Sequence, residues 1–370
     1  MTIPVVIAAG GTGGHLVPGF AIADALRRAR TDIEVCFVGT ERGLERDLVP
    51  KAGYRVRTTG VRPFTRDVKG LLAPASLVPA VVRARAILRT ERARAVVGMG
   101  GYPSVPVVAA ARTLRIPAVI HEANAIPGLA NQLAARFTPN VAVAFEEAAS
   151  RFPRHRIRAV GMPMRNEITH LDREALRPSA LELFGLEPHR HTILVLGGSQ
   201  GAARIDDAIA GVAAGWAERT DVQIVVAAGR LHAERVRAAM PAGALIARVE
   251  PFIERMDLAY AAADVAVSRA GASTVFELAA AGVPSILIPF PHARRGEQDA
   301  NAQALAVPGA AVVIADDRLE PVSLGAALDE LLRDRARLER MQAAARGIAR
   351  PDAADAMARW VLELAESGRG

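Results

Sequence analysis

The sequence predicts an α/β fold of two Rossmann-like domains, whose parallel sheets face each other across a cleft. A chain of 370 residues is long for one hydrophobic core and suits two domains. Residues 4–9 form a continuous apolar run, typical of a parallel strand covered on both faces, and lead into the glycine loop 10–14. Residues 191–196 and the glycine loop 197–201 repeat this order. Each half therefore opens with a strand, a glycine loop and a helix.

The first half continues with further strands and helices. The apolar pattern predicts a helix from about residue 17 to 30, and strands at 33–38, 140–145 and 157–160. A strand that begins at residue 95 runs into a second glycine loop at 98–101, and one that begins at residue 118 ends in His121, Glu122 and Asn124. Open α/β sheets bind ligands at the carboxyl ends of their strands, so these loops are candidate sites.

A connection with Gly and Pro, residues 161–165, marks the expected boundary between the domains. We therefore expect an N-terminal domain of residues 1–161 and a C-terminal domain of residues 162–350. A helix within 351–370 is expected to fold back across the join. The second domain should contain strands at 191–196, 221–228, 245–249, 264–268 and 285–288.

The stretch 268–301 contains the most informative local pattern. Gly271 allows a sharp turn after a short strand, and Ser273 or Thr274 is a candidate N-cap for the helix that follows. Gly282 is the residue expected just after the end of that helix. The stretch therefore predicts a strand, a tight turn, a helix and a further strand.

The start of this helix predicts a nucleotide site. A helix N-terminus favours a phosphate group, and Glu277 lies four residues after Ser273 on the same face. A carboxylate there can accept hydrogen bonds from two sugar hydroxyls, and phosphate beside ribose indicates a nucleotide. Taken alone, an ordinary capped helix explains the stretch equally well. Two nucleotide motifs are excluded, because Leu16 stands where the dinucleotide fingerprint needs a small residue and the Gly-Lys pair of a P-loop is missing from the glycine loops.

Composition limits the classes of partner. The chain has 46 Lys and Arg against 39 Asp and Glu, and this basic excess suits an anionic partner. Aromatic residues make up only 4%, which argues against a nucleic-acid surface built on base stacking. The single Cys36 lies in an apolar strand and is expected to be a buried small hydrophobe. We expect neither a signal peptide nor a membrane span, and hence a cytosolic protein.

The run 61–89 is a candidate membrane-contact surface. It combines apolar and basic side chains, which suits an anionic bilayer. The residues are Leu71, Leu72, Leu77, Val78, Val81 and Val82, among Arg62, Arg66, Lys69, Arg83 and Arg85. The alternative is an ordinary helix that packs its apolar face inward.

Taken together, the motifs resemble those of the MurG family of bacterial peptidoglycan glycosyltransferases, and the resemblance covers essentially the whole chain. The matching segments are 10–15, 98–102, 121–124, 197–201, 251–253 and 271–277. The resemblance implies a GT-B fold and an inverting transfer of N-acetylglucosamine from UDP-N-acetylglucosamine to undecaprenyl-diphospho-N-acetylmuramoyl-pentapeptide. It implies a β(1→4) product, no metal or other cofactor, and a peripheral place on the cytoplasmic face of the cell membrane, against its anionic inner leaflet and near other wall-synthesis proteins.

The same resemblance implies a set of site residues. Glu277 would hold the ribose, and the backbone of Ile253 would contact uracil. The diphosphate would be held by Ser199, Arg165 and the helix start formed by Ala272, Ser273, Thr274, Val275 and Phe276. Gln298 and Asn124 would contact the sugar, with Asn301 supporting that edge. Thr12, Gly13 and Gly14 would line the cleft, and Gly100, Gly101 and Tyr102 would lie on the acceptor side. The family usually has Asn in place of Met162 and often has His in place of Glu297.

The catalytic base is expected to be His15 or Glu122. A helix N-terminus disfavours the imidazolium of His15 and keeps the ring able to accept a proton. The alternative role of His15 is only to shape the glycine loop, and Glu122 is the second candidate for the base. Arg165 and the helix N-terminus would neutralise the departing UDP without a metal.

Other functions fit the same residues. A UDP-N-acetylglucosamine 2-epimerase shares the architecture but needs no lipid acceptor. A scaffold that binds the UDP-sugar without catalysis, and a related transferase acting on another lipid or natural product, are further alternatives. Release of UDP with and without the lipid acceptor separates them.

Overall fold

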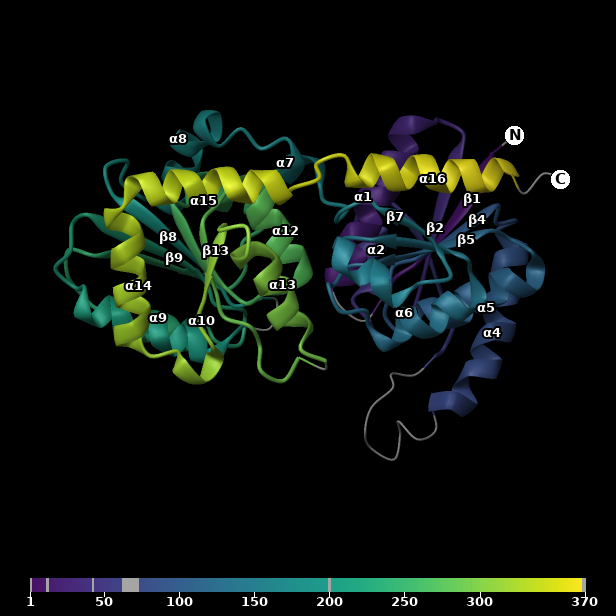
Figure 1. The fold of residues 1–370 in the computed structure, drawn as a ribbon, viewed down its shortest axis with the longest axis horizontal. Coiled ribbons are helices and arrows are strands. Elements are labelled where there is room, and N and C mark those ends of the chain that lie inside the picture. The colour runs from purple at the N-terminus through teal and green to yellow at the C-terminus, as the bar shows by residue number, and fades with distance from the viewer. Residues whose placement is uncertain are drawn as a thin grey trace. The chain divides into compact units, whose positions relative to one another are not determined.

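The computed structural model describes residues 2–10, 13–41, 43–61, 73–198, 201–293 and 295–367, of which 73–76 are described by their backbone alone (Figure 1). The chain forms two compact units. Unit 1 comprises residues 1–165 and 350–370, and unit 2 comprises residues 166–349.

The division falls four residues after the expected boundary at residue 161. The connecting segment stays with unit 1 because it is anchored there. The Gly161 N–H donates to the Val143 carbonyl at 3.3 Å, and the Gly161 carbonyl accepts from His121. Met162 and Met164, which follow, are buried.

Unit 1 contains a parallel sheet in the order β3-β2-β1-β4-β5-β6-β7. The strands are β1 (Ile3–Ala8), β2 (Ile33–Gly39), β3 (Arg55–Thr58), β4 (Ala95–Gly98), β5 (Ala118–Glu122), β6 (Asn140–Val143) and β7 (Arg156–Ala159). Cys36 is buried in β2, as expected, and burial raises the pKa of its thiol to about 11. The short β3 was not expected, because it is a largely exposed edge strand without an apolar pattern.

Helices cover this sheet. They are α1 (Gly13–Ala29), α2 (Glu45–Lys51), α4 (Ala73–Thr90), α5 (Ser104–Leu114), α6 (Leu129–Ala134) and α16 (Ala353–Ser367), with 3₁₀ turns η1 (Ala135–Phe137) and η2 (Glu146–Arg151). The helix α1 begins at Gly13, four residues before the expected start, because glycines carry no side chain to extend the apolar pattern. The far ends of the chain meet here: α16 lies beside α1, and Trp360 and Met357 join Ile22 and Leu26 in one core cluster (Figure 1).

Unit 2 contains a second parallel sheet in the order β10-β9-β8-β11-β12-β13. Its strands are β8 (His191–Leu196), β9 (Val222–Ala227), β10 (Ile246–Glu250), β11 (Val265–Ser268), β12 (Ser285–Leu287) and β13 (Ala311–Val313). Its helices are α7 (Asn166–Thr169), α8 (Arg173–Phe184), α9 (Ala203–Gly215), α10 (Ala233–Ala239), α11 (Met256–Ala262), α12 (Ala272–Ala281), α13 (Glu297–Ala306), α14 (Pro321–Arg333) and α15 (Arg335–Ile348), with η3 (Asp316–Arg318).

The ends of α12 differ in how well the sequence predicted them. Gly282 follows the helix with φ 61°, in the left-handed conformation expected there. The predicted cap by Ser273 or Thr274 is wrong: Gly271 is the N-cap, and the helix begins at Ala272 without a side-chain cap. Ser273 and Thr274 therefore lie in the first turn, where their backbone N–H groups belong to the unpaired helix start.

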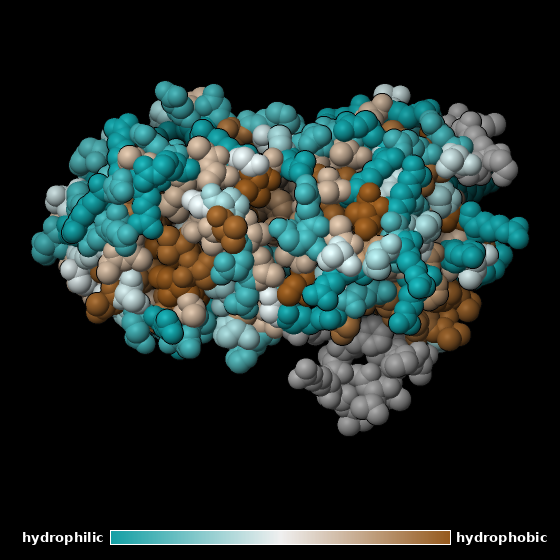
Figure 2. Space-filling view, in the orientation of Figure 1, coloured by the Kyte–Doolittle hydropathy of each residue, from teal (hydrophilic) through white to brown (hydrophobic). Residues whose placement is uncertain are grey.

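The helix α4 places the candidate membrane run in two different environments. Val78 and Val82 are 70% and 60% exposed, four residues apart on one face. Leu77 and Val81, which were expected in the same patch, instead pack against a core cluster, because Ala80, Ala84 and Leu88 of the same helix are buried. Arg62, Arg66, Lys69, Leu71 and Leu72 lie outside the described residues. Figure 2 shows hydrophobic surface in the region of α4 and α5. Within the described residues, no helix is long and apolar enough to cross a membrane.

Candidate functional site

In unit 1, Gly10 and His15 lie against the second glycine loop, at the carboxyl ends of the neighbouring strands β1 and β4. Gly100 and Gly101 have φ of 93° and 70°, which only glycine adopts readily. A Cβ on Gly100 would lie 2.9 Å from His15 Cδ2, and one on Gly101 would lie 2.8 Å from the Gly10 carbonyl oxygen. The structure thus brings His15 together with the second glycine loop.

His15 is the third residue of α1 and is half-buried. Burial lowers its pKa, so the imidazole is neutral at pH 7. We expected a neutral ring from the helix N-terminus, and burial acts in the same direction. Gly13 and Gly14 form the first turn of the same helix, and Thr12 lies outside the described residues. Burial raises the pKa of the half-buried Tyr102 in the second loop.

Glu122 is buried at the end of β5, and its carboxylate accepts four hydrogen bonds. The donors are Asn124 N at 2.9 Å, Asn124 Nδ2 at 3.3 Å, Gly128 N at 3.1 Å and Asn131 Nδ2 at 2.9 Å. Burial raises the pKa of Glu122, and these hydrogen bonds oppose the rise. The carboxylate therefore organises the loop 123–128 and the start of α6, and it sets the position of Asn124.

Two residues that sequence reasoning missed support these loops. Asn131 links Glu122 to the backbone, because its Nδ2 also donates to the His121 carbonyl at 2.9 Å. Glu45 is buried and accepts from Thr40 Oγ1 at 2.7 Å. A Cβ on Gly10 would lie 2.6 Å from Glu45 Oε1, so the first glycine loop packs on this carboxylate. A lone Glu and a lone Asn outside the glycine motifs carried no local signal of these contacts.

In unit 2 the candidate residues gather where β11 and β12 end. Glu277 lies in the second turn of α12, half-buried, and Tyr260 of α11 donates a hydrogen bond to its Oε2 at 2.8 Å. Ser273 and Thr274 are half-buried in the first turn. Ala272, Val275 and Phe276 have buried side chains, so these residues can offer a ligand only backbone groups.

The remaining candidates differ in their roles. Gln298 of α13 accepts from the Phe290 N–H at 3.0 Å, which ties it to the loop after β12. Asn301 is fully buried and donates to the Ala270 carbonyl at 3.1 Å, so it supports the turn that precedes α12. Ile253 is buried in the loop after β10. Glu297, where the family often has His, accepts from the Arg295 N–H at 2.8 Å.

Of the two side chains expected to bind the diphosphate, Arg165 lies among the described residues and Ser199 does not. Arg165 ends the connecting segment of unit 1, and its Nε is buried without a hydrogen-bond partner among the residues that the structure describes. A buried guanidinium N–H that lacks a partner is expected to receive one from a ligand or water. Ser199 lies outside the described residues.

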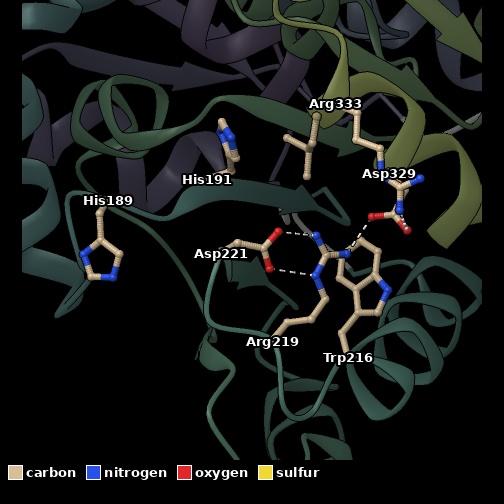
Figure 3. A pocket seen from close by; sticks show the side chains of 8 residues that line it. His189, His191, Trp216, Arg219, Asp221, Asp329 and Arg333 are labelled. Atoms are coloured by element: carbon tan, nitrogen blue, oxygen red, sulfur yellow. Dashed lines mark hydrogen bonds and ion pairs between the residues drawn. The ribbon is translucent and has the colours of Figure 1, made fainter.

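Unit 2 also contains a pocket of about 530 Å³ that none of the candidate site residues lines (Figure 3). It lies at the amino ends of β8 and β9, since His191 begins β8 and Asp221 precedes β9. Its Arg219 guanidinium binds Asp221 and Asp329 at 2.6 Å each and stacks over the Trp216 ring at 4.3 Å (Figure 3). These paired charges stabilise the sheet edge opposite to the one at which open α/β sheets bind ligands.

Comparisons with known proteins identify the family. Residues 5–143 match the glycosyltransferase family 28 N-terminal domain, and residues 192–357 match the family 28 C-terminal domain. The crystal structure of Acinetobacter baumannii MurG superposes with a TM-score of 0.78 at 29% identity, over 98% of this chain and 99% of that chain. A Paenarthrobacter aurescens relative named UDP-N-acetylglucosamine–N-acetylmuramyl-(pentapeptide) pyrophosphoryl-undecaprenol N-acetylglucosamine transferase is 43% identical, over 98% of this chain and 96% of its own length. The chain belongs to the MurG family of glycosyltransferases.

Membership of the MurG family confirms the expected GT-B fold of two parallel-sheet domains and makes this chain a glycosyltransferase. A UDP-N-acetylglucosamine 2-epimerase structure also superposes, with a TM-score of 0.64 over 96% of this chain and 94% of that chain. Its identity is only 12%, so that likeness shows a shared fold and nothing about the reaction.

Proposed function

We propose that this protein transfers N-acetylglucosamine from UDP-N-acetylglucosamine to undecaprenyl-diphospho-N-acetylmuramoyl-pentapeptide, the step that forms lipid II of peptidoglycan. The observation that carries this proposal is the match, over nearly the full length of both chains, to relatives named for this reaction. The arrangement of charged and backbone groups in unit 2 supports the donor.

The donor binds along α12 in this proposal. Among the residues that the structure describes, the backbone N–H groups of Ala272, Ser273 and Thr274 have no acceptor, and such groups at a helix start favour a diphosphate. Glu277, one turn further, accepts hydrogen bonds from the ribose hydroxyls. The backbone of Ile253 contacts uracil.

Other residues of the proposed site contact the diphosphate and the sugar of UDP-N-acetylglucosamine. Ser199 and Arg165 bind the diphosphate, while Gln298 and Asn124 contact the sugar. Asn301 acts indirectly, through the carbonyl of Ala270.

Departure of UDP places negative charge on the diphosphate, and the protein's own groups neutralise it. The positive end of α12 and the Arg165 guanidinium supply charge and hydrogen bonds without a metal. Such preorganised donors act most strongly where charge develops in the transition state. We therefore propose a metal-independent reaction.

The acceptor hydroxyl attacks the anomeric carbon from the face opposite the diphosphate. The bond from that carbon to the diphosphate oxygen breaks, and the configuration inverts. His15 takes the hydroxyl proton in this scheme, because its lowered pKa keeps the imidazole neutral at pH 7. Glu122 is assigned a positioning role, because its carboxylate already accepts four hydrogen bonds from its own loop.

The lipid acceptor places the protein on the cytoplasmic face of the cell membrane, as a peripheral protein. Val78 and Val82 on α4 provide an exposed apolar face, and Arg83 and Arg89 on the same helix are exposed. Apolar side chains beside cations suit an anionic leaflet.

The decisive experiment measures UDP release from UDP-N-acetylglucosamine, with and without a synthetic lipid I analogue. We expect release only with the analogue, and a disaccharide product. Formation of the manno epimer from the donor alone would indicate an epimerase. Donor binding without release would indicate a scaffold, and turnover with a different lipid or natural product alone would replace the proposed acceptor.

Membrane binding is tested by co-sedimentation with vesicles. We expect more binding to anionic than to neutral vesicles at low salt, because the basic side chains are attracted to anionic lipids. This preference should shrink as salt is added, because screening limits the reach of charge to about 8 Å at physiological ionic strength. Val78→Ser combined with Val82→Ser should weaken it. Val322→Ser, which changes a valine of unit 2 that is 85% exposed, is the matched control and should not. Equal binding to both vesicle types would contradict the electrostatic part.

A further inference from the structure

Tyr260 and Glu277 form a hydrogen-bonded pair inside unit 2. Tyr260 is fully buried in α11, and its hydroxyl donates to Glu277 Oε2 on α12 at 2.8 Å. A buried phenol needs a hydrogen-bond partner, and a carboxylate forms one of the stronger bonds available to it. The scheme of donor binding above gives Tyr260 no task.

Arg173 of α8 fixes the relative position of α11 and α12. Its Nε donates to the Tyr260 carbonyl at 3.1 Å, its Nη1 donates to the Gly282 carbonyl at 3.1 Å, and its Nη2 donates to the Ala263 carbonyl. Gly282 follows the end of α12, and Ala263 follows the end of α11. Burial lowers the pKa of Arg173 to about 10, so the guanidinium remains charged at pH 7. The Tyr260 hydroxyl therefore reaches Glu277 from a rigid support.

We propose that Tyr260 is a positioning residue that holds the Glu277 carboxylate for the ribose hydroxyls of a uridine diphosphate donor. This role rests on the proposed function. Glu277 is half-buried, and a glutamate side chain has several rotamers. A ligand that binds only one of these rotamers loses affinity, because binding then costs side-chain conformational entropy. The hydrogen bond from Tyr260 removes part of that freedom before the ligand binds. Site groups locked by such supporting bonds bind their ligands more tightly.

Tyr260→Phe tests the role, because it removes one oxygen atom and keeps the buried ring. We expect the Kd of UDP, measured by isothermal titration calorimetry, to rise about tenfold, which corresponds to about 1.4 kcal/mol. The Kd of 2′,3′-dideoxy-UDP, which lacks the ribose hydroxyls, should stay within about twofold of the parent value. The kcat at saturating UDP-N-acetylglucosamine should also stay within about twofold. An unchanged UDP Kd, or an equal loss for both nucleotides, overturns the proposal.

Tyr54→Phe is the matched control. The Tyr54 hydroxyl is also buried and also donates to a carboxylate, that of Asp24, but it belongs to unit 1. This variant should leave the UDP Kd unchanged, and circular dichroism melts show whether each Phe variant is folded. In a Glu277→Ala background, Tyr260→Phe should cause no further loss of affinity, and a further tenfold loss there overturns the role of Tyr260.

The calorimetry separates this role from the proposed function. It needs no acceptor, so a wrong acceptor leaves the result readable. A parent protein that binds UDP with an affinity that Tyr260→Phe does not change overturns only the role of Tyr260. A parent protein that binds neither nucleotide overturns the proposed donor and this role with it.

Discussion

His121 should make unit 1 less stable as the pH falls from about 6.5 to 4. The side chain is fully buried at the end of β5, and its Nε2 lies 3.0 Å from the Gly161 carbonyl. A carbonyl only accepts, so Nε2 carries the proton. Nδ1 is buried and has no partner among the described residues, so a second proton would be placed there without one. Burial accordingly lowers the pKa of His121 from 6.5 to about 4.

Acid destabilises the folded protein because the unfolded chain binds a proton at His121 more tightly than the folded protein does. The unfolded chain binds it near pH 6.5, whereas the folded protein binds it only near pH 4. The contribution of His121 to stability is therefore fully present above pH 6.5 and is lost as the pH falls through that value toward 4. The slope is about 1.4 kcal/mol per pH unit, and the total approaches roughly 3 kcal/mol.

Tryptophan fluorescence gives a probe for unit 1. The chain has two tryptophans, Trp216 in unit 2 and the fully buried Trp360 in α16 of unit 1. In a Trp216→Phe background, urea unfolding followed through Trp360 reports unit 1. His121→Gln keeps an N–H donor for the Gly161 carbonyl but does not titrate. We expect the advantage of His121 over this variant to shrink by about 1.4 kcal/mol per pH unit between pH 6.5 and 5.

The matched control is His189→Gln, which removes an exposed histidine of unit 2. It should leave the pH dependence of the Trp360 transition unchanged. The reasoning is refuted if His121→Gln and the parent protein lose stability with the same slope between pH 6.5 and 5. That result would mean that the protonation of His121 is not coupled to unfolding.

Four further predictions concern the reaction. Glu277→Ala should raise the KM for the donor at least about tenfold, since a hydrogen bond to a charged group contributes roughly 1.5–3 kcal/mol. The KM of Glu277→Gln should lie between those of the parent protein and Glu277→Ala. Equal KM values for the parent protein and Glu277→Ala in steady-state assays would contradict the ribose contact. His15→Ala should lower kcat by roughly 10²–10⁴-fold with little change in donor Kd, and an unchanged kcat would exclude His15 as the base. Glu122→Gln should lower the melting temperature and leave the pH profile of kcat unaltered, whereas loss of the acid limb of that profile would favour Glu122 as the base. Turnover in excess EDTA should equal turnover in magnesium, and a loss reversed by manganese would contradict the metal-free mechanism.

Much of the fold was predictable because its signals are local. The apolar runs at 4–9 and 191–196 form the inner strands β1 and β8 of the two sheets. A strand buried on both faces needs apolar residues in succession, and such a run is visible without knowing its neighbours. Gly282 was predictable for a similar reason, since a left-handed residue after a helix strongly favours glycine.

The sequence by itself determined the chemistry available to the site. Glu277, His15 and Arg165 stand at recognisable places in motifs, and their residue types set which groups can accept a proton, bind a hydroxyl or neutralise a phosphate. These properties belong to the side chains and their immediate neighbours in the chain. They pointed to a transferase family before any contact was known.

Only the tertiary structure decided which of these groups meet. The Tyr260 hydroxyl reaches Glu277 from another helix, and His15 of α1 lies against Gly100 of the loop after β4. The same holds for α4, where Val78 is exposed and Leu77 packs inward, although the two are adjacent and both apolar. Pairings between distant segments depend on how helices and strands pack, and a single sequence contains no local pattern that specifies them.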